Sequence, residues 1–369
     1  MSITSKIQSL TDDLVRIPSE SGDKQACFRV LKYVEHLFEG TSYIVQWFEH
    51  NGSPSLCISK KKTLTFSFIL CGHLDVVPAD DTQYVPHIDG DRLYGRGAAD
   101  MKGSCAVMIE LMRNHEHSRF FEDVGLVLTT DEEIGGDDGV GYLVSLGLSA
   151  PTVFVPDGGE PLTPCVFEKG DVSFSLEVEG VPAHGARPWL GVNAIERLMD
   201  DLAAIRSHFP PVEPPNEWGT TCNIGIVSGG SAVNSVAAHA QCQINMRHGE
   251  DTNAEKLLEE LRGLVSYASV TQMSVTPVVK VNESSDTYQL FSSLLEKNGG
   301  SSLGVKEHGA CDACFFVGVA ENILITKPES SPFHVVDEWV SLSSLEALYH
   351  ALDEFARTYL SMNLELPFP

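Results

Sequence analysis

The sequence is poor in positive charge, because 25 lysines and arginines stand against 51 aspartates and glutamates, for a formal net charge of −26. A chain of that sign repels nucleic-acid backbones and anionic lipid surfaces, so we expect neither as a partner. No apolar run approaches the roughly 20 residues that a membrane-spanning helix needs. The first ten residues lack the basic start and apolar stretch of a secretory signal, so the expected compartment is the cytoplasm.

Cysteine is present, but without the pattern of a disulfide scaffold. The nine cysteines are odd in number and scattered along the chain, which favours buried reduced thiols. Cys311 and Cys314 form a single CxxC pair. A structural zinc site usually needs a second such pair, which the sequence lacks, so a redox function of this pair is the weaker alternative.

Several common catalytic signatures are also missing. The sequence contains no HExxH zinc motif, no GxSxG nucleophile elbow and no Walker-type phosphate loop. The stretch 95–103 comes close to the dinucleotide-binding pattern GxGxxG, but Asp100 occupies the last position. A carboxylate there would repel a pyrophosphate, which argues against a nucleotide-dependent oxidoreductase.

What the sequence does contain predicts a globular protein with two domains. Hydrophobic residues make up 43% and charged residues 21% of the 369 residues, and this length exceeds one ordinary core. Up to about residue 168, apolar strand patterns alternate with helical patterns, which predicts an α/β domain with a mostly parallel sheet flanked by helices. The expected strands here are 63–71, 124–128 and 153–155, and the expected helices lie within 11–38, 101–114 and 140–148.

The pattern changes between residues 169 and 280. The stretch 171–180 alternates apolar and polar residues, as a strand with one solvated face does. A β-α-β-β-α-β order follows, which predicts a small sandwich-like α+β domain. Its expected elements are strands at 171–180, 222–227, 237–246 and 270–281, and helices at 192–208 and 252–267.

A helical, mixed pattern returns after residue 280, with a strand expected at 323–325 and a final helix at 342–360. We therefore predict a catalytic domain in two pieces, residues 1–168 and 281–369. The inserted domain, residues 169–280, would interrupt it.

Polar side chains follow three predicted strands of the first domain at the points where those strands end. In chain order they are His73, Asp75, Glu132, Glu133 and Asp157. Ligands in such sheets bind beyond the carboxyl ends of the strands, so we expect these side chains to gather at one edge. Imidazole and carboxylate groups are also suitable ligands for catalytic metal ions.

Two local patterns add chemistry to this edge. His73 and Asp75 are two residues apart, so in an extended segment both side chains point the same way, and the carboxylate can orient a ligating imidazole. Glu132 and Glu133 are adjacent, so one can bind metal while the other takes a proton from water. The alternative for the acid pair is an acidic turn that opens a helix.

Five segments, in this order and spacing, resemble motifs of the co-catalytic zinc aminoacylase family. That family includes acetylornithine deacetylase, succinyl-diaminopimelate desuccinylase, glutamate-releasing carboxypeptidases, and di- and tripeptidases. The segments are GHLDVVP (72–78), YGRGAADMKG (94–103), TTDEEIGG (129–136), PDGGE (156–160) and FHVVDEW (333–339). Residues 183–195 and 233–247 look like motifs of the family's lid domain, which agrees with the inserted domain predicted above.

The resemblance implies a site for two divalent metal ions. His73 and Asp157 would bind one ion, Glu133 and His334 would bind the other, and Asp100 would bridge them. Zinc is the expected metal, with cobalt and manganese as alternatives that suit the same ligands. In the deacetylase and desuccinylase branches the residue at position 157 is usually Glu, so Asp157 favours the peptidase branches.

The resemblance also implies catalytic and substrate-binding residues. Glu132 would be the general base, and Asp75 would orient His73. His184 in the lid would polarise the scissile carbonyl group, often across a dimer, and Asn234 and Arg247 would hold the carboxylate of the substrate. From the residues alone, His184 could be a plain loop histidine, Asn234 a turn residue, and Arg247 the partner of a nearby acid.

One loop differs from the family pattern. Where the family's substrate loop often carries Ser or Thr, then Asp, then Arg, this chain reads GACDAC over residues 309–314. Gly309 remains the expected substrate-binding residue of this loop.

Together these observations predict a metal-dependent hydrolase, a deacylase or metallopeptidase in which two metal ions activate a water molecule. The substrate would be a small N-acyl amino acid or short peptide, cleaved at its amide bond. Two alternatives stay open, a di- or tripeptidase or carboxypeptidase of the same family and an inactive member that only binds metal and ligand. A homodimer through the lid domain is compatible with either.

Overall fold

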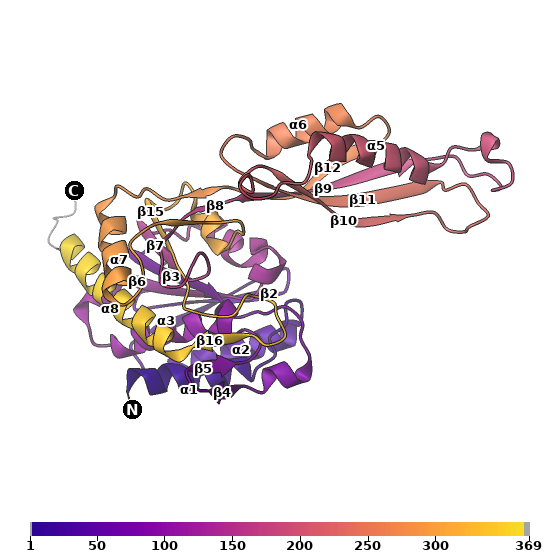
Figure 1. The fold of residues 1–369 in the computed structure, drawn as a ribbon. Helices are drawn as coiled ribbons and strands as arrows, with labels where there is room; N and C mark the ends of the chain where they lie inside the picture. The colour runs from indigo at the N-terminus through magenta and orange to yellow at the C-terminus, as the bar shows by residue number, and fades with distance from the viewer. Residues whose placement is uncertain (1, 365–369) are drawn as a thin grey trace. The chain divides into compact units, whose positions relative to one another are not determined.

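The structure, a computed structural model, describes residues 2–364 (Figure 1). The chain divides into two compact units. The first contains the described residues up to Phe167, then Lys280–Glu307 and the residues from Cys311 onward. The second contains Glu168–Val279 together with His308–Ala310. No helix among the described residues is long and apolar enough to cross a membrane.

The first unit is built on a nine-stranded sheet with the strand order β1-β2-β6-β3-β7-β15-β8-β13, in which β14 pairs with β8. Strands β3, β6, β7 and β15 run parallel to one another at its centre, which confirms the predicted α/β class. The strands are β1 (Ile44–His50), β2 (Ser53–Ser59), β3 (Phe68–His73), β6 (Val124–Thr129), β7 (Thr152–Val155), β8 (Cys165–Glu168), β13 (Val279–Lys280), β14 (Val305–Glu307) and β15 (Asn322–Ile325).

Helices pack against this sheet around one large hydrophobic core. Every residue of β3 and β6 is buried, as expected for central parallel strands. The α-helices of this unit are α1 (Ile3–Val15), α2 (Lys24–Leu37), α3 (Gly103–Asn114), α4 (Tyr142–Ser145), α7 (Asp286–Lys297) and α8 (Leu342–Leu364). A small antiparallel sheet has the order β16-β5-β4, formed by β4 (His87–Asp89), β5 (Arg92–Tyr94) and β16 (Trp339–Ser341).

Short helical turns connect these elements. They are η1 (Asp81–Tyr84), η2 (Ala98–Lys102), η3 (Arg119–Asp123), η4 (Glu132–Ile134), η5 (Asp137–Gly141) and η7 (Asp312–Phe316). Two of them, η2 and η4, carry residues of the predicted metal site.

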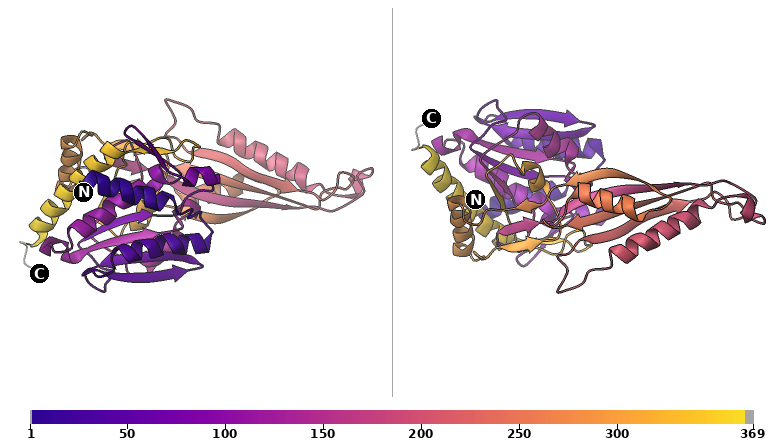
Figure 2. Two further views of the ribbon diagram at one scale, coloured as in Figure 1. Left: turned by 90° about the horizontal axis from the view of Figure 1, so that it is seen from below. Right: turned by 90° about the horizontal axis from the view of Figure 1, so that it is seen from above.

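The second unit is a four-stranded antiparallel sheet, with the order β10-β11-β9-β12, covered on one face by two helices (Figures 1 and 2). Its element order is the predicted β-α-β-β-α-β. The alternating apolar residues of β9 and β11 point to the helices and form a separate core. The elements are β9 (Gly170–Glu179), α5 (Ala194–His208), β10 (Thr221–Gly229), β11 (His239–His248), α6 (Ala254–Leu264) and β12 (Ser269–Thr276), with the turn η6 (Pro188–Leu190) before α5.

Some predicted elements differ from the structure in their bounds. Strand β3 begins at Phe68 rather than at residue 63, because the preceding backbone bonds to loops, as Ser67 N does to Asp123 O at 3.0 Å. The strand expected at 270–281 is split between β12 and β13, and Pro277 lies in the interruption, where it has no N–H for a ladder. Strands β1 and β2 form a hairpin that was not predicted.

Candidate metal centre

The central parallel strands deliver polar residues to one edge of the sheet. Strand β3 ends at His73, which lies opposite Thr129 at the end of β6. The turn η4 follows β6 with Glu132 and Glu133, and Asp157 follows β7. Because β3, β6 and β7 are parallel neighbours, these ends meet at one edge, as the sequence predicted.

Two groups of three side chains form at this edge. In each group, one potential ligand atom per residue lies within 4.8 Å of the other two. The first group is His73, Glu132 and Asp157, and the second is Asp100, Glu133 and His334. His334 comes from the loop between β15 and β16, so residues distant in the sequence from the strand ends complete the site.

Asp100 belongs to the second group and also contacts His73 of the first. Its Oδ1 is 3.0 Å from Nε2 of His73, and its Oδ2 is 3.3 Å from Nε2 of His334. One carboxylate oxygen therefore faces each imidazole, which is the geometry that a carboxylate shared by two ions needs. Nε2 of His334 is also 3.1 Å from Glu133, whereas Nε2 of His73 is 3.6 Å from Asp157.

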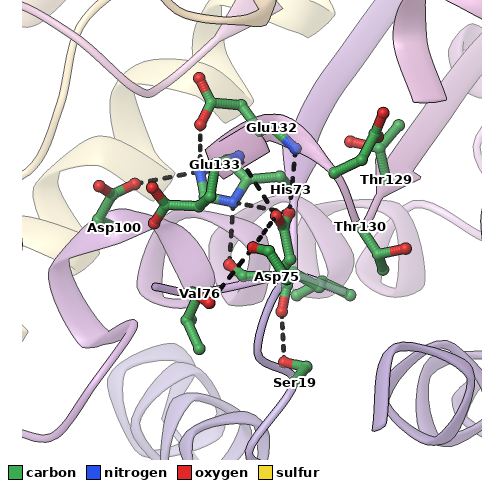
Figure 3. A network of polar contacts seen from close by, with 12 residues as sticks. Ser19, His73, Asp75, Val76, Asp100, Thr129, Thr130, Glu132 and Glu133 are labelled. Atoms are coloured by element: carbon green, nitrogen blue, oxygen red, sulfur yellow. Dashed lines mark hydrogen bonds and ion pairs between the residues drawn. The ribbon is translucent and has the colours of Figure 1, made fainter. Parts of the chain in front are cut away.

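Asp75 connects the first imidazole with the acid pair (Figure 3). Nδ1 of His73 lies 3.1 Å from the backbone oxygen of Asp75 and 3.3 Å from its Oδ1, so a proton on Nδ1 leaves Nε2 free to bind a metal. The Asp75 carboxylate also accepts the backbone N–H groups of Glu132 and Glu133, at 3.3 and 3.2 Å. Ser21 Oγ donates to it at 2.6 Å.

Glu338 performs a similar function for the loop that carries Asp100. Its Oε1 accepts the backbone N–H groups of Ala99 and Asp100, at 2.9 and 3.3 Å. Its Oε2 lies 2.5 Å from Nη1 of Arg96 in a buried ion pair. The loop's N–H groups therefore bond to the protein itself, which agrees with the rejection of a nucleotide-binding loop; Gly95 N also donates to Glu338 O at 2.9 Å.

The site is crowded with negative charge. Burial, with the charge of Asp100 next, raises the pKa of Glu133 to about 7 and that of Asp157 to about 6. Burial and the nearby carboxylates also raise the pKa of Glu132 well above its ordinary value. Asp100 is the exception, because hydrogen bonds from His334 and His73 outweigh its burial and lower its pKa.

The pKa values of the two imidazoles are also raised, but by their carboxylate partners rather than by burial. Burial lowers the pKa of His73, but hydrogen bonds with Asp100, Asp157 and Asp75 outweigh it and raise the pKa well above its ordinary value. The hydrogen bond with Asp100 likewise raises the pKa of His334. The site therefore attracts positive charge, which two divalent cations would supply in place of protons.

The residues fit a pair of metal ions. Imidazole nitrogen and carboxylate oxygen are suitable ligands for zinc, and the site offers two groups of them that meet at Asp100. Without compensating cations, several carboxylates buried together at the end of the sheet would destabilise the folded state.

A further buried carboxyl group, Asp312 in η7, contacts the end of β6. Its Oδ2 accepts a hydrogen bond from Thr129 Oγ1 at 3.3 Å. A Cβ at Gly136 would come within 2.4 Å of its Oδ1, so a side chain at that glycine would displace it. Asp312 therefore packs against both ends of the turn that carries Glu132 and Glu133.

The predicted catalytic and carboxylate-binding residues of the lid lie in the second unit. His184 and Asn234 are exposed neighbours there, since Gly185 N donates to Asn234 O at 2.7 Å and His184 bridges to Ser235. Nδ1 of His184 accepts the N–H of Ala186 at 3.0 Å, so its Nε2 is the ring atom that remains for a ligand.

Arg247 lies on β11 with its side chain 33% exposed, and its Nη2 is 2.7 Å from Asp171 Oδ2. The expected alternative, a pairing with a nearby acid, is therefore present in the structure. A partly exposed ion pair of this kind is weak, so Arg247 can exchange its partner. Gly309 belongs to the segment His308–Ala310, which groups with the second unit.

Sequence reasoning missed Ser21, Glu338, Arg96 and Asp312. Glu338 lies inside the motif FHVVDEW, and Asp312 inside the GACDAC loop, so both stood in segments that were singled out. No sequence signal pairs Glu338 with Arg96, which is 242 positions earlier. Ser21 had no signal at all.

The fold and the two ligand groups define a metal-dependent hydrolase with a dinuclear centre. The model of Peptidase family M20/M25/M40 matches residues 69–358, and the chain belongs to this family. This result confirms the family resemblance found in the sequence motifs.

Individual relatives agree with this assignment. The chain is 27% identical over 321 residues to a succinyl-diaminopimelate desuccinylase of Methylibium petroleiphilum, covering 77% of this chain and 79% of that one. It is 31% identical over 249 residues to a probable carboxypeptidase of Paracoccidioides brasiliensis, covering 63% of this chain and 55% of the relative, about half of its length. Its fold resembles that of an M20 family metallo-carboxypeptidase from Sulfolobus solfataricus, with a TM-score of 0.79, 15% identity and coverage of 96% and 99% of the two chains.

Proposed function

We propose that this hydrolase cleaves the amide bond of an N-acyl amino acid or a short peptide with a free carboxylate, and that Glu132 is the general base. The observation that supports this proposal most directly is the position of Glu132. Its Oε2 lies 3.9 Å from Nε2 of His73, within the first group of potential ligands, and no hydrogen bond to its side-chain carboxylate is found among the described residues. The relatives named desuccinylase and carboxypeptidase act on bonds of this class.

In this proposal His73 and Asp157 hold one ion, Glu133 and His334 hold the other, and Asp100 bridges them. When bound, two such ions polarise the scissile carbonyl group and lower the pKa of a water molecule. Zinc is the proposed metal, and cobalt and manganese suit the same ligands. Elemental analysis of the purified protein would identify the metal and its stoichiometry.

Glu132 then has two tasks. It takes a proton from the attacking water and passes it to the leaving nitrogen, as a positioned general acid–base does. Asp75 holds the N–H groups of Glu132 and Glu133 and the Nδ1 edge of His73, so we propose that it orients the base and one ligand together.

We assign residues 1–168 and 281–369 to a catalytic domain and residues 169–280 to a lid domain. His184 would donate a hydrogen bond to the developing oxyanion through Nε2, since its Nδ1 is occupied by Ala186. Arg247 and Asn234 would bind the substrate carboxylate, and Gly309 would provide backbone contacts. The weak surface pair of Arg247 is consistent with this function, because the substrate could replace Asp171.

A homodimer through the lid domain is part of the proposal. Strand β10 is an edge of the four-stranded sheet, and the large apolar side chains of Ile226 and Val227 on it are 54% and 56% exposed. An exposed apolar edge strand is typical of a surface that a second chain covers. Light scattering of the wild type and of Ile226→Asp would test this, with a monomeric variant as the expected result.

We also propose a cytoplasmic location. Six cysteines are free thiols, and five of them are buried: Cys27, Cys57, Cys71, Cys105 and Cys242, with Cys222 partly exposed. Stable free thiols are typical of reducing compartments. Fractionation of expressing cells would test this proposal.

The test of the proposed activity is a substrate panel with the metal-loaded protein. The panel contains N-acetyl and N-succinyl amino acids and unblocked dipeptides, each with its carboxamide analogue. The proposal expects turnover of at least one class, abolished by a chelator and strongly reduced in the carboxamide analogues. Turnover that does not depend on the free carboxylate would contradict the proposed substrate class while leaving the metal-dependent hydrolase intact.

A further inference from the structure

A cavity in the first unit shares no lining residue with the metal centre. Its volume is about 780 Å³, within the range of roughly 300 to 1,000 Å³ that small-molecule sites occupy. Helix α2 forms one wall, strand β1 another, and the β1–β2 turn closes one end. Its lining residues are Lys24, Gln25, Phe28, Arg29, Lys32, Trp47, Phe48, Glu49, Gly52 and Pro54.

The cavity has an aromatic floor that is already positioned. The rings of Phe28 and Trp47 lie 5.0 Å apart, tilted by 34°, and Phe28 is 46% exposed although it is a large apolar side chain. Trp47 Nε1 donates to Glu35 Oε1 at 2.7 Å, which fixes the indole in place. Flat, pre-positioned aromatic surfaces bind flat apolar groups at little entropic cost.

The rim of the cavity is positively charged. Three cations, Lys24, Arg29 and Lys32, line it together with the single acid Glu49. This composition is unusual in a chain with twice as many acids as bases. Two of these bases flank Phe28 because Lys24, Phe28 and Lys32 recur every four residues on the exposed face of α2.

The three cations differ in their hydrogen-bond and ion-pair partners. Lys32 is paired with Glu35 at 2.6 Å and lies 4.6 Å from the Trp47 ring centroid. Lys24 donates to the neutral backbone oxygen of Asn51 at 3.1 Å, so its charge has no counter-ion there. Arg29 has no hydrogen bond or ion pair within residues 2–364, so its guanidinium group is available to an incoming anion.

Glycine at position 52 allows this arrangement. Its φ is +90°, and a Cβ there would lie 1.7 Å from Nζ of Lys24. Any side chain at this position would therefore push Lys24 away from the end of the cavity. Gly52 in the β1–β2 turn thus allows the Lys24 ammonium group to lie at the end of the cavity.

We propose that this cavity binds a small organic anion that carries a flat aromatic group, at a site distinct from the metal centre. The ring of the ligand lies against Phe28 and Trp47, and its carboxylate or other anionic group contacts Arg29 and Lys24. Charge complementarity and volume both favour such a molecule, and the proposed hydrolysis does not use this site.

The experiment is isothermal titration calorimetry of the full-length, metal-loaded protein with 2-naphthoate and with the neutral analogue 2-naphthamide. We expect one naphthoate to bind, and naphthamide to bind about tenfold more weakly, because it lacks the charge-assisted contact. Arg29→Glu and Phe28→Ala are each expected to weaken naphthoate binding about tenfold or more, since each removes one of the two contacts. Both side chains are exposed, so the fold should persist, which circular dichroism checks.

The matched control is Arg206→Glu, because Arg206 is an exposed arginine on helix α5. This variant should bind naphthoate like the wild type, and Arg29→Glu should keep the wild-type hydrolytic rate. Naphthoate binding that is equal in wild type, Arg29→Glu and Phe28→Ala would overturn the proposal. Tighter binding of the blocked peptide acetyl-Glu-Phe-Glu-amide than of naphthoate would instead assign the cavity to an acidic protein segment and equally contradict a small-molecule ligand.

Discussion

The metal centre of the first unit and the candidate substrate residues of the second unit differ in how their polar groups are held. At the metal centre, His73 and Asp75 are fully buried and each has several partners. In the second unit, His184 and Asn234 are exposed, and Arg247 has one partially solvated partner. Both sets come from segments that resemble one family's motifs, so the motifs alone do not distinguish these environments.

The difference indicates what each set requires for stability. Buried carboxylates that repel one another require cations or protons, so the metal centre is coupled to the stability of the fold. Solvated side chains require no such compensation, so the second set can change partners when a substrate arrives. Substitutions in the first unit should therefore affect metal binding or chemistry, and those in the second unit should affect only turnover or substrate affinity.

The largest expected effect is that of Glu132→Gln. We expect kcat to fall by about 100- to 10,000-fold, because removal of a general base has effects of this size. The metal content, measured by elemental analysis, should stay at the wild-type level. Glu283→Gln, at an exposed acid in a loop, is the control and should be fully active.

The same measurement distinguishes a base from a ligand, since Glu132 belongs to one of the two ligand groups. Loss of metal together with activity would show that Glu132 is a metal ligand. Another residue would then have to be the general base. Glu133→Gln provides the contrast, because we expect it to lose metal.

A smaller effect is expected for His184→Ala in the second unit. Loss of one oxyanion donor typically lowers kcat by about 100- to 1,000-fold. The metal content and the melting temperature should not change, because His184 is exposed and bonds only locally. His239→Ala, at another exposed histidine of the same unit, is the matched control. A wild-type kcat for His184→Ala would refute its proposed catalytic function.

Arg247→Met should raise KM by about 10- to 100-fold with a smaller change in kcat, the pattern expected when a carboxylate contact is lost. The surface pair with Asp171 contributes about 1 kcal/mol or less, so the fold should persist. Arg206→Met is the control. An unchanged KM with a lower melting temperature would mean that Arg247 has only a structural function.

The smallest effect is on stability, and it depends on pH. In the metal-free protein the pKa values of Glu133 and Asp157 are about 7 and about 6, above those of an unfolded chain, so folding favours their protonated forms. The metal-free protein should therefore lose stability as the pH rises from about 4 through 7. The metal-loaded protein should not, because the ions replace the protons.

The measurement is the difference in melting temperature between metal-loaded and chelated protein, followed by calorimetry at pH 5.5 and pH 8. We expect the difference to be larger at pH 8. A difference that shrinks with rising pH would contradict the claim that uncompensated carboxylates distinguish the first region from the second.

Much of the metal centre was predictable because it depends on local rules. Apolar strands followed at once by His73, Glu132 and Asp157 indicate a parallel sheet whose ends carry ligands, and the structure brings these residues together. The element order of the second unit also followed from short-range periodicity. Both inferences use patterns that span fewer than about 20 residues.

The supporting residues were not predictable, because they depend on pairings across the chain. Glu338 is one of 51 acids, and nothing in its neighbours shows that it binds Arg96 and the backbone of Asp100. The β1–β2 hairpin is a different case. Its Asn51-Gly52 turn is a hairpin signal, but β1 lacks strict alternation of apolar and polar residues.

The position of Glu338 and His334 near the end of the sequence has a consequence for synthesis of the protein on the ribosome. His73, Asp100 and Asp157 are translated before the second unit, whereas His334 and Glu338 follow Asp157 by 177 and 181 positions. At typical elongation rates the interval is roughly 10 to 30 s. Throughout that interval the emerging chain would lack His334 of the proposed ligand set, so binding of both ions could be completed only after the second unit has been synthesised.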